Sequence, residues 1–111
     1  MIKFVHENDN ASSDHWNKCS ELHAPFIKIS RVDAAYSSVF FDITNFSVDL
    51  DEVSKDVKKL HVSYVDFFMC YDPIMDQRYD NHYFFELVVK YEHAEFIAAG
   101  LYDYLLNKIR A

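Results

Sequence analysis

The clearest structural signal in this chain is the stretch His82-Tyr83-Phe84-Phe85-Glu86-Leu87-Val88-Val89-Lys90-Tyr91. Apolar and aromatic side chains recur at every second position along it. Successive side chains of a β-strand point to opposite faces of a sheet, so this period indicates a strand with one face in a hydrophobic core. The predicted core residues of this strand are Tyr83, Phe85, Leu87, Val89 and Tyr91.

The same alternation occurs elsewhere in the chain and predicts a sheet. Residues 62–71 alternate, with Val65, Phe67 and Met69 on one side. A spacer of a few residues separates two further alternating runs, as in a β-hairpin. A short strand is expected close to the start of the chain. The predicted strands, in chain order, are residues 2–7, 26–32, 38–46, 62–71 and 82–91.

The first helical signal covers residues 13–23. Ser12 or Ser13 can cap its beginning by accepting a hydrogen bond from a backbone N–H of the first turn. Pro25 limits its end, because the residue before a proline avoids helical geometry.

Two further helices are predicted, over residues 50–60 and 94–109. Asp49 precedes the first of them, and Glu52 is expected to reach back to the cap as in a capping box. Both segments carry apolar residues at helical spacing, which indicates one buried side. These residues are Leu50, Val53, Val57 and Leu60 in the first, and Ala94, Ile97, Ala98, Leu101, Tyr104, Leu105 and Ile109 in the second.

The order of elements, β-α-β-β-α-β-β-α, predicts an α+β fold in a single globular domain over residues 1–111. Its first six elements match the split βαβ, or ferredoxin-like, order. We expect one mostly antiparallel sheet of about five strands, with the helices packed on one face. The other face would then expose an apolar patch, which usually marks an interface. The residues assigned to that face are Phe40, Phe46, Tyr64, Phe68, Phe84 and Val88.

Composition restricts the partners of this chain. The 111 residues carry 18 acids and 11 bases, for a formal charge of −7, and 17% of them are aromatic. Direct nucleic-acid binding needs clustered Lys and Arg, so a basic protein is the expected partner. The sequence contains no long apolar run and no signal peptide, so a cytoplasmic protein is expected, without a membrane partner. Cys19 and Cys70 are expected to be free thiols.

The segment between the last two predicted strands combines aromatic rings, carboxylates and an apolar tip. Tyr, Trp and Arg dominate interface hot spots, and carboxylates pair with a partner's Lys or Arg. Ile74 and Met75 lie where a hairpin tip would fill an apolar pocket. The alternative is a solvated acidic loop without a binding role. The predicted partner-binding residues are Asp72, Ile74, Met75, Asp76, Tyr79, Asp80 and His82, with Phe68 and Phe84 on the neighbouring strands.

A second constellation is His15, Cys19 and His23, spaced by four on the first predicted helix. Zinc prefers such ligands, but three residues spread over two turns splay apart, so these three are only a weak candidate for a metal site. The alternative is that Cys19 packs inward while the histidines lie at the boundary of the core. No nucleotide-binding or nucleophile motif is present, and we expect neither an enzyme nor a cofactor.

The favoured interpretation is a small acidic inhibitor that binds a basic, nuclease-type toxin, as an immunity protein or antitoxin does. In size, charge and composition the chain resembles small acidic α/β proteins of the barstar and contact-dependent-inhibition immunity kind. That resemblance is one of type, and no stretch matches residue by residue. The alternatives are a phage-type polyanion mimic that inhibits a DNA-binding protein, and a structural subunit that forms a homodimer through the aromatic sheet face.

Overall fold

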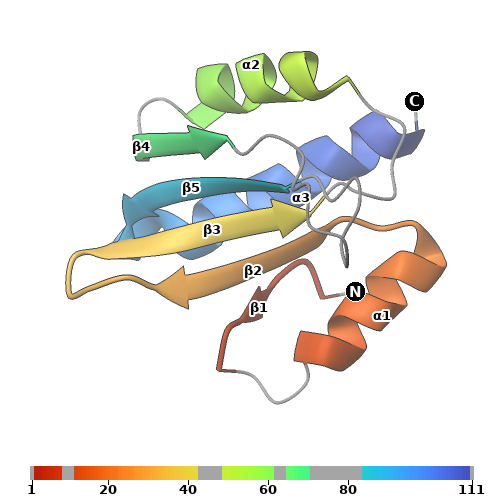
Figure 1. The fold of residues 1–111 in the computed structure, drawn as a ribbon, viewed down its shortest axis with the longest axis horizontal. Coiled ribbons are helices and arrows are strands. Elements are labelled where there is room, and N and C mark those ends of the chain that lie inside the picture. Colours follow the sequence, from red (N-terminus) through yellow and green to blue (C-terminus); the bar gives the residue numbers. More distant parts are fainter. Residues whose placement is uncertain (1, 9–11, 43–48, 62–64, 71–83, 111) are drawn as a thin grey trace, which may run out of the picture.

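The computed structural model describes residues 2–8, 12–42, 49–61, 65–70 and 84–110 (Figure 1). It contains α-helices, strands and a short 3-10 helix, η1, and it has the predicted order of strands and α-helices. The elements are β1 (Val5–His6), α1 (Ser12–Leu22), β2 (Phe26–Arg31), β3 (Tyr36–Asp42), α2 (Leu50–His61), β4 (Val65–Cys70), β5 (Phe84–Lys90), η1 (Tyr91–His93) and α3 (Ala94–Arg110).

The described strands form one sheet in the order β1-β2-β3-β5-β4. The α+β class and the single sheet are therefore confirmed. The sheet is mixed, because β1 runs parallel to β2 while the other neighbours are antiparallel. The ferredoxin-like arrangement is matched only roughly. The strands that α1 connects are direct neighbours, so no other strand splits the βαβ unit.

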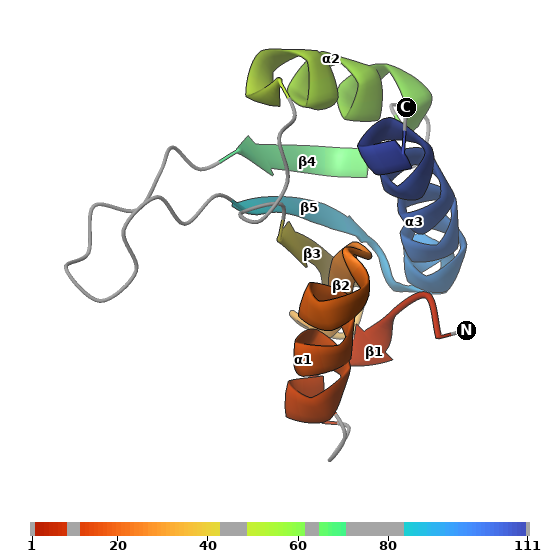
Figure 2. The ribbon, with the colours of Figure 1, turned by 90° about the vertical axis from the view of Figure 1, so that its right-hand side faces the viewer.

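The prediction that all helices pack on one face is wrong for α1. In Figure 2, α1 and α3 lie on opposite sides of the sheet, and α2 lies over β4. Alternation along β2 explains this arrangement. Ile27 packs in the core that α2 and α3 cover, whereas its neighbour Phe26 packs with Cys19 of α1 on the other side. Apolar side chains on both faces of β2 need a covering helix on each side.

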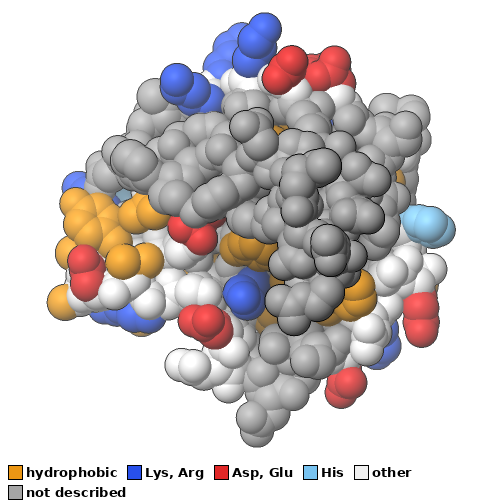
Figure 3. Space-filling model, viewed as in Figure 1, with side chains coloured by type: hydrophobic (Ala, Val, Ile, Leu, Met, Phe, Trp, Pro, Cys, Tyr) orange, Lys and Arg blue, Asp and Glu red, His pale blue; other side chains and the backbone are white. Residues whose placement is uncertain are grey.

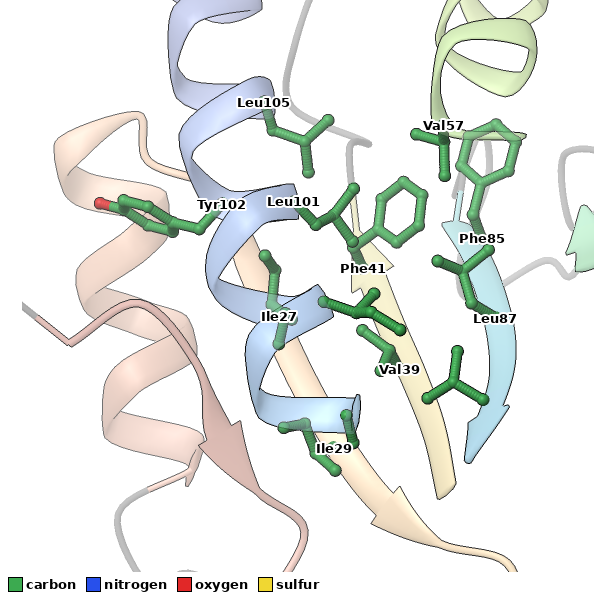
Figure 4. Close-up of a cluster of buried hydrophobic side chains, with 14 of the residues drawn as sticks. Ile27, Ile29, Val39, Phe41, Val57, Phe85, Leu87, Leu101, Tyr102 and Leu105 are labelled. Carbon is green, nitrogen blue, oxygen red and sulfur yellow. The ribbon is translucent and has the colours of Figure 1, made fainter. Parts of the chain in front are cut away.

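The main core lies between the sheet and the helices α2 and α3 (Figure 4). The rings of Phe41 and Phe85 stack with their centroids 5.1 Å apart. Full burial of such a side chain stabilises the fold by roughly 1.5–3 kcal/mol. The predicted core residues Phe85, Leu87 and Val89 are confirmed, as are the stripes of α2 and α3 where their side chains are described. The fully buried larger side chains are Phe41, Phe85, Ile27, Leu87, Ile97, Leu101, Leu105, Val39, Val53, Val57 and Val89.

Helix α1 ends in a Schellman motif that the sequence does not predict, because the usual glycine is absent. The N–H of Ala24 donates to the carbonyl of Cys19 at 2.9 Å, and the N–H of His23 donates to that of Ser20 at 3.5 Å. His23 has φ 51°, in the left-handed region, where glycine is the usual residue. The contact between Cys19 and Ala24 in the smaller core completes the motif. His23 therefore has a backbone role at the end of the helix.

The predicted cap of α2 is confirmed. One carboxylate oxygen of Asp49 accepts from the N–H groups of Asp51 and Glu52, at 3.0 and 3.1 Å. The capping box is wrong, since the Glu52 side chain pairs with Lys108 of α3 and does not reach back to the cap. Figure 3 shows acidic side chains at one end of the upper rim and basic ones at the other, in agreement with the order of charges along α2. This order complements the helix dipole.

Two local predictions fail near the ends of β4 and β5. Tyr91, predicted as a core residue of the last strand, is 56% exposed and begins η1. The N–H of Tyr91 still donates to the carbonyl of Ala35 at 2.8 Å, in register with the pairing of β3 and β5, and η1 then leads into α3. The strict alternation predicted for β4 is broken between Val65 and Phe67 by a bulge or irregularity, where the register with β5 shifts. Tyr83 lies outside the described residues.

Candidate functional site

Most of the predicted partner-binding segment lies outside the described residues, namely Asp72, Ile74, Met75, Asp76, Tyr79, Asp80 and His82. The structure does describe the backbone on either side of it. Cys70 pairs with Phe85, so the chain leaves β4 and enters β5 at the same end of the sheet. In the register, Phe68 pairs with Leu87 and Phe84 pairs with Asp42. The role of these residues in binding stays a prediction.

The sheet face opposite α2 and α3 is more polar than the sequence predicts. Phe40 is half-buried, and its ring centroid lies 6.5 Å from that of Phe26. The Lys28 ammonium lies 5.3 Å from the centroid of the Phe40 ring. Val88, also predicted for this face, is half-buried. Phe46 and Tyr64 lie outside the described residues. The register assigns polar residues to the same face beside the aromatic Phe26, Tyr36 and Phe84. These polar residues are Lys28, Ser30, Ser38, Asp42, Glu86 and Lys90.

The structure brings together two of the three weak metal candidates. The Nε2 atom of His15 lies 3.5 Å from the Sγ atom of Cys19, and both residues are buried. His23 is exposed after the end of α1. Among the described residues, no three His, Cys, Asp or Glu side chains are placed to hold a metal ion together. The predicted set His15, Cys19 and His23 is therefore not assembled as a ligand group.

The electrostatics of this pair suit a structural role. Burial, assisted by the charge of Lys18, lowers the pKa of His15, and burial raises the pKa of Cys19. Both groups are therefore held in their uncharged forms. A protonated buried thiol is a poor nucleophile and a poor metal ligand. His15 also lies beside the ring of Phe26, with 5.8 Å between the ring centroids.

Sequence reasoning missed a pocket of about 260 Å³ at the junction of β1, the β2–β3 hairpin and the start of α3. It lies at the C-terminal end of β5, next to Tyr91, whereas residues 71–83 precede the N-terminal end of β5. The His6 Nε2 atom lies 3.0 Å from a carboxylate oxygen of Glu95 and links β1 to α3. The residues that line the pocket are His6, Ile29, Arg31, Ser37, Tyr91, Glu92, Ala94 and Glu95.

Arg31 is fixed firmly at the wall of this pocket. Its Nε atom donates to the carbonyl of Asp33 at 2.6 Å, and one Nη atom donates to that of Ala34 at 2.8 Å. Its Cζ atom lies 3.4 Å from the centroid of the Tyr91 ring. Stacking and two hydrogen bonds orient the guanidinium plane. The Asp33 carboxylate stabilises the same turn by accepting from the N–H groups of Ala35 and Tyr36, each at 2.8 Å.

Ser37 contributes the most deeply buried polar group of the pocket. Its side chain is 1% exposed, and its hydroxyl oxygen has no hydrogen-bond partner in the described part of the protein. Ser37 pairs with Arg31 across the hairpin, so the two side chains lie on the same face of the sheet. The predicted hairpin of residues 26–32 and 38–46 brings Arg31 close to Ser37. The contribution of His6 and Glu95 has no local signal, because 89 positions separate them.

No described helix is both long and apolar enough to cross a membrane. No family model, no curated protein and no solved structure matches this chain.

Proposed function

We propose that this chain is a small acidic binding protein that neutralises a basic protein, in the manner of an immunity protein or antitoxin against a nuclease-type toxin. The observation that carries the proposal is the aromatic and acidic segment 71–83, inserted between β4 and β5. It contains three Asp and three Tyr against a single Arg. Cys70, which precedes the segment, pairs with Phe85, so β4 ends and β5 begins at the same end of the sheet.

Charge complementarity supports a basic partner. Residues 62–107 carry eight acids and two bases, so most of the net charge of −7 lies in the second half of the chain. A nuclease active site gathers positive charge to bind phosphate. An acidic and aromatic surface is complementary to such a site in charge and supplies hot-spot side chains.

The pairing of the described carboxylates disfavours the polyanion mimic. A mimic of DNA needs a row of unpaired carboxylates at phosphate-like spacing. Here Asp103 pairs with Lys3 at 2.9 Å, and Asp56 accepts a hydrogen bond from Tyr104 at 2.7 Å. Glu52 pairs with Lys108, and Glu95 contacts His6. These carboxylates are engaged within the fold, which favours a localised contact over a long anionic face.

The polar sheet face disfavours the structural homodimer. An apolar dimer interface resembles a domain core cut in half. The described part of the face opposite α2 and α3 instead places Lys28, Asp42 and Glu86 beside Phe40. Asp42 is already buried within the chain, and burial of the half-buried Lys28 and Glu86 against a second copy would require a partner for each charge.

The proposal is tested with the protein encoded beside this chain's gene, which we expect to carry a basic C-terminal toxin domain. The variant Asp72→Asn/Asp76→Asn/Asp80→Asn removes three carboxylates from the segment. Loss of their ion pairs is expected to raise the dissociation constant for that domain by about 10- to 100-fold. Isothermal titration calorimetry measures the change directly.

A matched control separates local contacts from net charge. Glu7, Asp14 and Glu21 are exposed on the first part of the chain. The variant Glu7→Gln/Asp14→Asn/Glu21→Gln changes the net charge by the same amount and is expected to keep most of the affinity. Equal affinities of the two triple variants would show that the segment makes no specific contact, and absence of any binding would refute the proposed function.

A further inference from the structure

We propose that the pocket between Ser37 and Glu95 binds a small zwitterion of the α-amino acid class. The proposal is independent of the toxin partner, since the pocket lies at the opposite end of β5 from segment 71–83. It rests on the distribution of charge around the pocket, on the fixed guanidinium of Arg31 and on the buried hydroxyl of Ser37.

The two walls of the pocket carry opposite charges. The sheet wall supplies Arg31 and its cross-strand neighbour Ser37. The wall formed by η1 and α3 supplies the carboxylates of Glu92 and Glu95. Among the described residues, no ion pair joins Arg31 to either carboxylate. Glu95 contacts His6, and Glu92 contacts His93. A ligand with a charge of each sign complements both walls at once.

The sheet wall suits a carboxylate. The guanidinium of Arg31 is held by two backbone carbonyls and by the Tyr91 ring, which leaves its second Nη atom as a donor without a partner in the described part of the chain. A guanidinium that is already oriented loses little entropy when it binds a carboxylate. The opposite wall suits an ammonium group, which can donate to the second carboxylate oxygen of Glu95, since the Nε2 atom of His6 contacts the first.

Ser37 is the independent sign that this pocket receives a ligand. A buried hydroxyl without a hydrogen bond loses its hydration without compensation, so folded proteins rarely keep one. Rotation about the single torsion χ1 moves the serine oxygen, and a ligand in the pocket can therefore draw it into a hydrogen bond. The volume of about 260 Å³ restricts that ligand to a small molecule.

The test is a titration of the full-length, ¹⁵N-labelled protein with glycine and L-alanine, followed by backbone amide shifts. The half-ligands acetate and ethylammonium are titrated in parallel. We expect saturable shifts at Ser37, Tyr91 and Glu95 with the amino acids, and binding of each half-ligand that is weaker by about tenfold or more. Absence of saturable shifts at millimolar amino acid would overturn the proposal, as would a half-ligand that binds equally well.

Variants with matched controls assign the contacts. Ser37→Ala and Glu95→Gln are each expected to weaken glycine binding by about tenfold. The controls are Ser38→Ala, whose side chain points to the other face of the sheet, and Glu21→Gln on α1, and both are expected to bind normally. Loss of binding in the controls, or retained binding in both pocket variants, contradicts the assignment.

Stability without ligand supplies a second readout for Ser37. If its hydroxyl is kept for a ligand, Ser37→Ala removes an unpaired polar group and leaves the urea midpoint of unfolding unchanged or raised. A lowered midpoint would mean that the hydroxyl stabilises the fold itself, and the proposal would lose its main support. Neither readout requires a basic protein partner, so failure here and failure of the toxin proposal are distinguishable.

Discussion

At the scale of single residues, His23 shows how a side chain chosen as a metal candidate has a backbone role. It occupies the left-handed position after α1 with φ 51°, although it has a Cβ atom. A left-handed conformation costs an L-residue roughly 1–2 kcal/mol, a cost that glycine avoids. The Schellman hydrogen bonds of Ala24 and His23 hold the strained residue in place.

Replacement of His23 by glycine is therefore expected to stabilise the protein. Relief of the left-handed strain exceeds the extra entropy of glycine in the unfolded chain, and we expect a gain of about 0.5–1 kcal/mol. Urea unfolding followed by circular dichroism measures it. His23→Ala keeps the Cβ atom and serves as the control, with no gain expected. A His23→Gly protein less stable than the wild type would show that the imidazole itself stabilises the end of α1.

Burial of single residues could be predicted where they lie in long periodic runs. Phe85, Leu87 and Val89 are buried as the alternation of β5 predicts. The same alternation extended to Tyr91 is wrong, because η1 begins there and the Tyr91 ring lies against the Arg31 guanidinium, outside the core. Arg31 lies in a hairpin distant in sequence, and a local pattern contains no information about it.

At the scale of elements, α2 and α3 are joined by a polar cluster at the edge of the main core. The Tyr104 hydroxyl of α3 donates to the Asp56 carboxylate of α2 at 2.7 Å. Lys108 pairs with Glu52 and lies 3.8 Å from an Asp56 oxygen. Burial, the hydrogen bond to Asp56 and its negative charge raise the pKa of Tyr104 well above its ordinary value.

Tyr104→Phe is expected to destabilise the protein at neutral pH by about 1–2 kcal/mol, because it removes a hydrogen bond to a charged group. A tyrosine whose pKa is raised by folding loses its stabilising contribution as the pH rises above the unfolded value of about 10. The difference between wild type and variant should therefore shrink in alkaline solution. Urea unfolding at neutral pH and above pH 10 measures both effects, and a difference that grows with pH would contradict this account.

The order of elements could be predicted from sequence, but their assembly could not. Helices α2 and α3 lie close to their predicted bounds, because each has a clear apolar stripe, and α2 also has a capping aspartate. The side of the sheet that α1 covers depends on the parallel pairing of β1 with β2, which two residues of β1 establish. The pocket likewise depends on contacts between elements that are distant in sequence. Its walls come from β1, the hairpin and α3, which meet only in the folded chain.

At the scale of the whole molecule, charge is the property that connects the fold with the proposed function. The described carboxylates of α2 and α3 are largely paired within the fold, as Glu52 and Asp103 illustrate. Segment 71–83, with three Asp against one Arg, accounts for two of the seven net negative charges of the chain. An excess of one sign accelerates the encounter with an oppositely charged partner and makes its rate dependent on salt.

The most direct test of capture by charge is the association rate constant between this chain and the basic domain encoded beside its gene, measured by stopped flow at two ionic strengths. The Debye length falls from roughly 30 Å at 0.01 M salt to roughly 8 Å at 0.15 M. Charge-steered capture predicts that the rate constant falls by about tenfold or more over this range. A rate constant that stays unchanged would contradict the proposed mechanism.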